Sequence, residues 1–241
     1  MDVVQLSDAR FEDLISRFAG SRIAVVGDFF LDKYLDVDPT LLELSLETGK
    51  RAHQVVGIRC SPGAAGTVVC NLAALGAGQL HAVGFTGDDG EGFDLRKELA
   101  RLGCGTNHLQ VAADRRTPTY LKPRDTNTAS LAAEHNRYDT KNRSVTPAGL
   151  EQAVVASLDQ LLPHADAVIV LDQVEEANCG VITHRIRDML ADRARRHRQV
   201  VFWADSRRRI RRFAGVIIKP NQFEAVGNED PHPGDVIAPE D

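Results

Sequence analysis

The chain has 241 residues, of which 43% are hydrophobic and 26% charged, and a formal net charge of -5 at pH 7. This length suits one large α/β domain, with or without a small accessory piece, and the composition is that of a globular protein with a sizeable core. The acidic balance argues against a general nucleic-acid-binding protein, and no uncharged apolar run approaches the roughly 20 residues of a membrane span. The four cysteines have no CxxC spacing, which argues against a zinc site and a disulfide framework.

The first part of the chain predicts a helix, a buried strand and a region without a long helical signal. Apolar residues recur at helical spacing over 8–19, and the apolar run 22–26 ends at Gly27-Asp28. Such a run is typical of a parallel strand whose C-terminal end opens a site. Residues 34–59 predict an excursion of strands or loop. Because residues 1–21 include acidic residues and no apolar signal core, we expect a cytoplasmic protein.

Residues 61–76 combine small residues with a helical apolar pattern that stops at a glycine. Glycine and alanine let a ligand approach main-chain N–H groups, and the first turn of a helix leaves such donors unpaired. We expect Val68, Leu72 and Leu75 to face a core, and Gly76 to take the left-handed position after the helix. The segment predicts either a ligand cradle or a tight packing turn.

Strand-like and helix-like windows alternate over the rest of the chain, which is the α/β pattern. The stretch 117–122 is β-prone but contains a proline, so we expect an edge or lid strand there. Residues 227–241 carry Pro, Gly and acidic residues with few apolar ones and predict a disordered tail. The other expected elements are strands over 80–85, 109–112, 167–171, 200–204 and 216–218, and helices over 89–102, 147–162 and 178–197.

Polar residues follow four of the expected strands: Asp28, Asp172, Asp205 and Asn221. In an open parallel sheet, ligands bind at the C-terminal edge of the strands, so these side chains are expected to converge on one crevice. The alternative is that each residue merely caps the helix that follows it.

Two basic runs, 193–198 and 207–212, are interpreted mainly as solvated surface. The first lies late in an expected helix, where cations suit the helix dipole. The second follows Asp205 at the expected ligand edge, so Arg207 or Arg208 is also a candidate for contact with a phosphate. The eight histidines show no paired metal-ligand spacing, and no serine or cysteine lies in a nucleophile-elbow motif, which argues against zinc enzymes and hydrolases.

Several segments match one known family, in the family's order, across residues 20–226. On these segments the chain resembles the ribokinase-like (PfkB-type) carbohydrate kinases, and within them it looks most like the heptose-7-phosphate kinase domain of bifunctional ADP-heptose synthesis proteins. The resemblance implies a doubly wound α/β domain over 1–226 with a mostly parallel sheet. The matching segments are 26–34, 62–77, 83–89, 137–139 and 219–224.

The family also has a small β lid, which covers the sugar and often forms the dimer contact. On that pattern, residues 34–59 and about 107–122 supply the lid of this chain, and a homodimer through the lid is expected. The resemblance implies a sugar or sugar phosphate as substrate, with ATP and Mg²⁺ as cofactors.

The residues on the sugar side follow from the same resemblance. Asp32 stands where the family places a carboxylate that accepts sugar hydroxyls, since one carboxylate can take two O–H donors. Gly63 and Ala64 occupy the family's Gly-Gly position, where main-chain N–H groups approach the sugar, and Ala64 replaces the second glycine. Thr67 stands in place of the usual Asn, so recognition of a sugar hydroxyl is expected to differ there.

On the phosphate side, Asn221 and Glu224 match the family's Asn-x-x-Glu element, which organises Mg²⁺ and the nucleotide phosphates. Glu224 is the expected metal ligand, acting partly through water, because Mg²⁺ prefers oxygen ligands and keeps several waters. From the residues alone, the same pair is a helix N-cap with a capping-box acid.

The family's catalytic segment, Asp-Thr-x-Gly-Ala-Gly-Asp, occurs nowhere in the 241 residues. That segment forms the anion hole for the phosphoryl group and supplies the base, so no catalytic residue is assigned and little catalysis by this chain alone is expected. Two functions stay open: a carbohydrate kinase truncated on its C-terminal side, and a non-catalytic sugar-phosphate-binding or interaction protein. A sheet without its last strands is also expected to expose an apolar edge.

Overall fold

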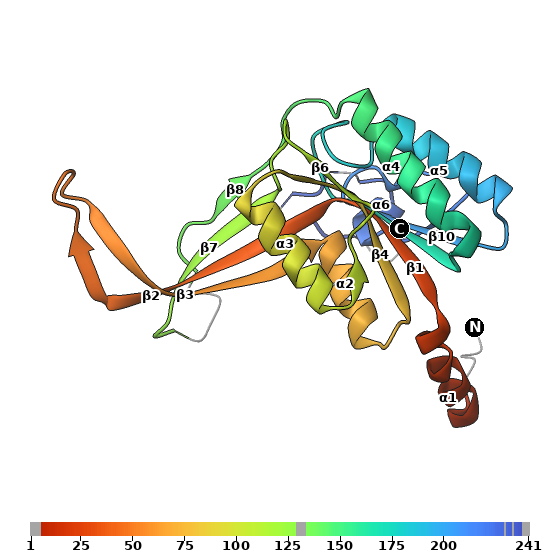
Figure 1. The fold of residues 1–241 in the computed structure, drawn as a ribbon, viewed down its shortest axis with the longest axis horizontal. Coiled ribbons are helices and arrows are strands. Elements are labelled where there is room, and N and C mark those ends of the chain that lie inside the picture. Colours follow the sequence, from red (N-terminus) through yellow and green to blue (C-terminus); the bar gives the residue numbers. More distant parts are fainter. Residues whose placement is uncertain (1–5, 129–133, 229, 233, 238–241) are drawn as a thin grey trace.

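The structure, a computed structural model, describes residues 6–128, 134–228, 230–232 and 234–237. It has the expected α/β architecture: a parallel sheet lies between helices, and a smaller mixed sheet extends away from them (Figure 1). No helix among these residues is both long and apolar enough to cross a lipid bilayer.

Within the described residues, the parallel sheet has seven strands in the order β11-β10-β9-β1-β4-β5, with β6 beside the C-terminal half of β4. Because every pairing is parallel, the C-terminal ends of the strands lie at one edge of the sheet. The strands are β1 (Arg22–Gly27), β4 (Gln79–Gly87), β5 (Cys104–Gly105), β6 (Leu109–Ala112), β9 (Ala167–Asp172), β10 (Val201–Ser206) and β11 (Ile217–Ile218).

Helices pack on both faces of this sheet. α4 (Ala148–Leu161) and α5 (His184–Arg196) lie on one face, and α2 (Ala65–Ala74) and α3 (Gly90–Arg101) lie on the other. The remaining helical elements are α1 (Asp8–Ser16), α6 (Gln222–Ala225) and the 3-10 turns Phe18–Gly20, Leu162–His164 and Ile210–Arg212.

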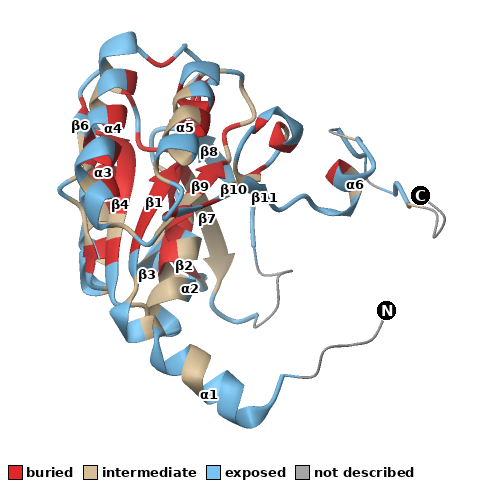
Figure 2. Ribbon diagram, turned by 90° about the vertical axis from the view of Figure 1, so that its right-hand side faces the viewer, coloured by how far each residue is buried: buried red, intermediate tan, exposed pale blue. Residues whose placement is uncertain are grey.

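Alternate residues of β1 face the two helix layers. Ala24 and Val26 join the core beneath α4 and α5, whereas Ile23 and Val25 join the core beneath α2 and α3. A strand buried on both faces has no polar side, which is why the sequence shows it as an unbroken apolar run. Figure 2 shows the buried strands between the helix layers.

The mixed sheet has the strand order β3-β2-β7-β8. β2 (Phe29–Leu44) and β3 (Arg51–Ala64) form a long antiparallel hairpin, whose tip extends well beyond the rest of the molecule (Figure 1). β7 (Thr119–Asp125) pairs with β2 in parallel, and β8 (Tyr138–Thr140) pairs with β7 in antiparallel orientation.

Part of the range expected for the lid lies in the parallel sheet instead. Residues 109–112 form β6 and pair with Gly84–Gly87 of β4, so within 107–122 only the residues of β7 join the mixed sheet. The physical reason is the shortness of β5, which pairs with β4 only at Leu80 and His81. The C-terminal half of β4 therefore keeps an edge that β6 fills.

Two expected helix features are wrong. The helix expected over 178–197 begins only at His184, because the side chain of Thr183 caps it by accepting a hydrogen bond from Ile186 N. Leu75 was expected to face the core but is 57% exposed. The buried residues of α2 are Ala65, Gly66 and Val69, and Val68 and Leu72 are partly buried against the same core.

The expected exposure of apolar sheet surface is confirmed at β10 and β11. Val201 is 50%, Trp203 39% and Ile217 49% exposed. They lie on the same face of the sheet as α2 and α3, beyond the part that these helices cover. Phe202 and Ala204 point the other way, into the core beneath α5. Of the expected disordered tail over 227–241, residues 229, 233 and 238–241 lie outside the described residues, so that expectation stays a prediction.

We predict that the double substitution V201T/I217T reduces self-association of the chain. Threonine keeps a high strand propensity but removes exposed apolar area. Light scattering as a function of concentration should fall, while the free energy of unfolding stays within about 0.5 kcal/mol. The matched control is Ala204→Thr on the buried face of β10, which should lower that free energy by about 1–3 kcal/mol because it buries a hydroxyl. Unchanged scattering from V201T/I217T would contradict the prediction.

Candidate functional site

Asp32 of β2 lies at the centre of the candidate site. In the mixed sheet it is opposite Ser61 of β3 and Tyr120 of β7. Its Oδ1 accepts a hydrogen bond from Lys122 Nζ at 2.7 Å, and the two side chains are 21% and 16% exposed. Because Lys122 occupies one carboxylate oxygen, the second oxygen can accept hydroxyl donors.

Lys122 is the residue of this site that the sequence did not reveal. Burial lowers its pKa, but the hydrogen bond and the charge of Asp32 outweigh burial and raise that pKa above its usual value. The ammonium group also lies 5.0 Å from the centre of the Tyr34 ring. Only the register of β2 with β7 brings Lys122 to Asp32, and the spacing along the chain does not report that register.

Gly63 contacts the same carboxylate. A Cβ at this position would lie 2.8 Å from Asp32 Oδ2, closer than van der Waals contact allows. Gly63 is buried and lies opposite Phe30 in the hairpin. The structure therefore brings Asp32 and Gly63 together. Because Gly63 has no side chain, the carboxylate of Asp32 has room to lie against its backbone.

Ala64 joins β3 to α2 in a conformation that suits glycine. Its φ is 52° and its ψ is -116°, in a region that costs a side-chain-bearing residue about 1–3 kcal/mol. The chain is held there because Ala65 N donates to the carbonyl oxygen of Asp28 at 3.0 Å. At the next turn, a Cβ on Gly66 would lie 2.4 Å from Pro62 Cβ, so the segment is a tight packing turn as well as a candidate cradle.

Thr67 is exposed in the first turn of α2. The first turn of a helix has N–H groups without helical partners, so a ligand near Thr67 would meet both the hydroxyl and these donors. The described contacts do not join Thr67 to Asp32, and its contact with a sugar stays a prediction.

Asn221 and Glu224 contact each other at the start of α6. Asn221 Oδ1 accepts a hydrogen bond from Glu224 N at 2.9 Å, and Glu224 Oε2 accepts one from Asn221 N at 2.7 Å. This is the capping box predicted from the residues alone. Glu224 is 4% exposed, and the described residues contain no cluster of three metal-ligating side chains. The part of Glu224 in metal binding stays a prediction.

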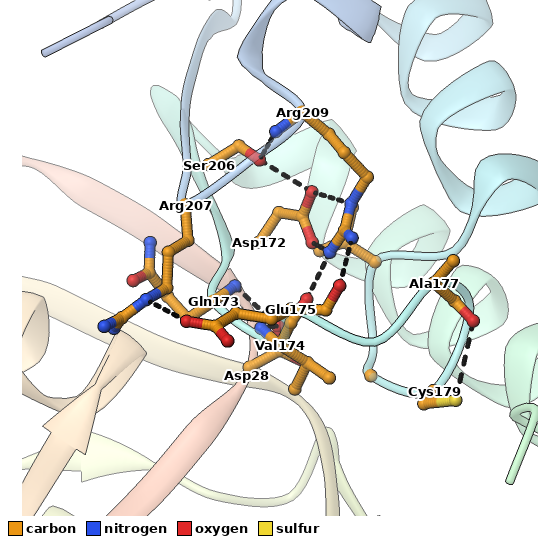
Figure 3. A network of polar contacts seen from close by, with 12 residues as sticks. Asp28, Asp172, Gln173, Val174, Glu175, Ala177, Cys179, Ser206, Arg207 and Arg209 are labelled. Atoms are coloured by element: carbon orange, nitrogen blue, oxygen red, sulfur yellow. Dashed lines mark hydrogen bonds and ion pairs between the residues drawn. The ribbon is translucent and has the colours of Figure 1, made fainter. Parts of the chain in front are cut away.

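The four polar residues at the strand ends do not form one open crevice. Asp28 is buried, and its carboxylate accepts hydrogen bonds from Gln173 N at 2.7 Å, Val174 N at 3.1 Å and Val181 N at 2.6 Å (Figure 3). It therefore fixes both ends of the loop between β9 and Thr183. Main-chain N–H donors occupy both carboxylate oxygens of Asp28, so this side chain holds the loop in place.

The other strand-end residues are also bound within the protein. Asp172 is 1% exposed and holds the Arg209 guanidinium at 2.8 Å and the Ser206 hydroxyl at 2.8 Å (Figure 3). Asp205 pairs with Lys219 at 3.0 Å. The capping alternative is thus correct for Asn221, whereas Asp28 and Asp172 hold loops rather than helices.

Basic side chains gather around Tyr120, beside Asp32. The Arg137 guanidinium lies 4.4 Å from the centre of the Tyr120 ring, and Lys122 Nζ lies 5.8 Å from it. Burial raises the pKa of Tyr120, the charges of Arg207 and Arg137 oppose the rise, and the charges of Asp139 and Glu175 add to it. Arg207 is tied by Glu175 at 2.8 Å. We call Lys122, Arg137 and Arg207 the Tyr120 basic cluster.

The chain matches known proteins over most of its length. The family described as pfkB family carbohydrate kinase matches residues 22–225. The bifunctional protein HldE of Gluconobacter oxydans (strain 621H) is 26% identical over 88% of this chain, and that of Bradyrhizobium sp. (strain ORS 278) is 30% identical over 77% of it. These matches cover 42% and 36% of the two relatives, so the chain spans less than half of their length.

Solved structures show the same fold. A protein of Clostridium perfringens, solved as a candidate sugar kinase, has a TM-score of 0.52 at 14% identity, over 87% of this chain and 66% of that one. The protein Sa239 has a TM-score of 0.52 at 15% identity, over 77% and 54% of the two chains. At these identities the likeness concerns the fold alone.

We predict that Ala64→Gly stabilises the chain. Glycine adopts a positive φ without steric cost, so relief of about 1–3 kcal/mol of strain should outweigh the roughly 0.4–1 kcal/mol of added unfolded-state entropy. Urea unfolding should show a gain of about 1 kcal/mol. The control, Ala156→Gly on the exposed side of α4, should lose about 1 kcal/mol because it weakens a helix. A loss at both positions would show that Ala64 is unstrained.

A second prediction concerns the pH dependence of stability. Burial and the charge of Asp172 raise the pKa of Asp28 to about 6, and the N–H groups of Val181, Gln173 and Val174 only partly oppose this. Because the folded-state pKa lies above the unfolded value near 3.9, the folded chain binds more protons between these two values. The contribution of Asp28 to stability is therefore largest below about pH 4 and falls by about 3 kcal/mol as the pH rises through 6.

The measurement is the unfolding free energy of the parent and of Asp28→Asn between pH 4 and pH 7. Asparagine does not titrate, so the advantage of the parent should shrink as the pH rises. Asp38→Asn is the control: hydrogen bonds from Thr40 lower the pKa of Asp38, so its small contribution should stay nearly constant between pH 4 and pH 7. An advantage of Asp28 that grows with pH would overturn the assignment.

Proposed function

Because the chain belongs to the pfkB family of carbohydrate kinases, we propose that it binds a sugar or sugar phosphate at Asp32, as the phosphate acceptor of an ATP-dependent kinase. The observation that carries the proposal is the mutual contact of Asp32 with Lys122 and the side-chain-free Gly63. These groups form a partly exposed, oriented carboxylate next to a glycine backbone.

In this arrangement, Asp32 orients the acceptor. Its Oδ2 accepts one or two sugar hydroxyls, while Lys122 holds Oδ1 and fixes the plane of the carboxylate. Thr67 and the N–H groups of the first turn of α2 complete the sugar side. Ala65 N is not one of these donors, because it is already bonded to the carbonyl of Asp28.

The Tyr120 basic cluster supports an acceptor that already carries a phosphate. Arg137 is bound to Asp139 through Nε and Nη2, which leaves Nη1 for another acceptor. Arginine and lysine near one another recognise phosphate oxygens by charge-assisted hydrogen bonds. A phosphate beside the Tyr120 ring would lie within reach of side chains from β7, from the start of β8 and from the end of β10.

On the nucleotide side, the family implies ATP and Mg²⁺ near Asn221 and Glu224. The capping box uses Glu224 Oε2, so Oε1 remains for a contact through a metal-bound water, which fits a cation that keeps most of its waters. Mg²⁺ would neutralise charge on the transferring phosphoryl group when bound. The family's base is not among the 241 residues, so the chain itself is proposed to bind and orient the acceptor.

The hairpin of the mixed sheet supports the proposed homodimer through the lid. Apolar side chains along β2, β3 and the turn between them are exposed, which supports a surface for a protein partner. A second copy of the chain is the proposed partner, in line with the family's use of the lid, and the cytoplasm is the proposed location. The exposed residues are Leu41, Leu42, Leu44, Leu46, Val55, Val56 and Ile58.

The test is calorimetric titration of the chain with hexose, pentose and heptose phosphates. Asp32→Asn should weaken binding about tenfold to a hundredfold, because hydrogen bonds to a charged group contribute about 1.5–3 kcal/mol. Lys122→Met should weaken it as well. Asp38→Asn, further along the same strand and bonded to Thr40, is the matched control and should leave affinity within twofold.

Equal affinities of the Asp32 and Asp38 variants would contradict the assignment of Asp32. Production of ADP in the same mixtures separates the two functions left open by the sequence. Binding without ADP supports acceptor binding by a chain that lacks the base, and robust turnover by the purified chain would contradict that view.

A further inference from the structure

Ser61 lies directly opposite Asp32 across the hairpin of β2 and β3. Residues paired in an antiparallel sheet turn their side chains to the same face, and their Cβ atoms lie about 4.5–5.5 Å apart. The pairing runs without a register shift over 29–36 of β2 and 57–64 of β3, so the two side chains share a face of the mixed sheet. A ligand held by the Asp32 carboxylate therefore comes within reach of the Ser61 hydroxyl.

The hydroxyl of Ser61 is available to a ligand. Ser61 is exposed on the outermost strand of the mixed sheet, and no hydrogen bond joins its hydroxyl to another of the described residues. A serine hydroxyl can donate one hydrogen bond and accept others. Its neighbours along the same face of β3 lack this capacity: Gly63 has no side chain, and Arg59 is bound to Asp36 through Nε and Nη2, both at 2.9 Å.

The charges on this face separate the phosphate of an acceptor from Ser61. Lys122 and Arg137 come from β7 and from the start of β8, and both lie near the Tyr120 ring. In the strand order β3-β2-β7-β8 they are on the other side of Asp32 from Ser61. A sugar phosphate that lies across the strands thus presents its phosphate to β7 and β8, and its hydroxyls to β2 and β3.

We propose that Ser61 is a specificity-determining residue of the acceptor site, and that it binds the sugar hydroxyl next to the one that Asp32 holds. The first hydroxyl donates to Asp32 Oδ2, because Lys122 already occupies Oδ1. The hydroxyl on the adjacent carbon forms a hydrogen bond with Ser61 Oγ. This role of Ser61 rests on the proposed binding of a sugar phosphate at Asp32.

Such a pair of residues selects acceptors by the configuration of two neighbouring hydroxyls. Two oxygens on adjacent carbons reach both side chains when they are gauche, as the equatorial hydroxyls of a pyranose are. When the two oxygens are anti, they point apart and one of them finds no partner. A site built to bond a hydroxyl also rejects an analogue that lacks it, because the bound sugar then covers a polar group without pairing it.

The experiment is calorimetric titration of the whole chain with glucose 6-phosphate and with its 2-deoxy, 3-deoxy and 4-deoxy analogues. The parent should bind glucose 6-phosphate saturably and should bind two analogues, altered at adjacent carbons, more weakly. Ser61→Ala should weaken glucose 6-phosphate about threefold to tenfold, the range of one neutral hydrogen bond, and should lose the discrimination at one carbon only. Asp32→Asn should lose the discrimination at the neighbouring carbon.

Two further variants separate recognition by the hydroxyl from a structural effect. Ser61→Thr keeps a hydroxyl on a residue that suits a strand, so its affinity for glucose 6-phosphate should be within twofold of the parent. The matched control is Cys60→Ala, at the next position of β3, where the thiol points to the opposite face of the sheet and contacts Asp94. It should also leave that affinity within twofold. Circular dichroism melting checks that each variant is folded.

The role of Ser61 is overturned if Ser61→Ala weakens glucose 6-phosphate and all three analogues by the same factor, or weakens none of them. A loss of affinity in Asp32→Asn alone would then leave the proposed acceptor site standing. An absence of saturable glucose 6-phosphate binding by the parent also overturns the role of Ser61. It overturns the proposed function as well if every pentose, hexose and heptose phosphate fails to bind.

Discussion

The two sheets of this molecule depend on one residue, Asp28, at which the chain leaves the parallel sheet and enters the mixed one. Its N–H donates to Leu171 O at 3.1 Å, its carbonyl accepts from Ala65 N at 3.0 Å, and its carboxylate holds the loop after β9. Gly27 precedes it at a φ of 153°, where a Cβ would lie 2.2 Å from Leu171 O. The direction of β2 is therefore set by contacts with β9, β3 and α2 together.

The candidate site follows from that direction. Asp32 lies four residues beyond the junction, on a strand whose pairing with β7 begins at Leu31 and Thr119. Register then places Lys122 beside Asp32, and the antiparallel return of β3 places Gly63 against the same carboxylate. The pairings of β2 with β3 and with β7 thus bring together the carboxylate of Asp32, the ammonium group of Lys122 and the backbone of Gly63.

Much of the fold could be read from the sequence because it rests on local patterns. Apolar runs such as 22–26 and 167–171 are long enough to mark buried strands, and the strands of the structure lie there. The reading failed where a segment is decided by its neighbours. Residues 109–112 look like any strand, and only the open edge of β4 assigns them to the parallel sheet.

The residues of the candidate site also differ in whether the sequence alone could identify them. Asp32 and Gly63 were identified through their resemblance to a family motif, whereas Lys122 depends on a register that no spacing reports. Asp28 was expected to face a ligand because it ends a strand. Whether such an acid meets a ligand or a loop depends on the path of the loop, and here residues 173–181 return three N–H groups to it.

Burying the Asp28 carboxylate costs free energy when it is ionised, but the carboxylate also anchors the loop after β9. Burial beside Asp172 makes ionisation unfavourable, and the three N–H groups that it accepts do not fully compensate. A neutral side chain at this position would avoid the charge but offers fewer acceptors to those N–H groups, and the loop after β9 would lose its anchor. The same loop supplies Glu175, which holds Arg207 beside Tyr120. The hydrogen bonds of the Asp28 carboxylate thus hold the loop that positions Arg207, although Gln173 lies 145 residues from Asp28 along the chain.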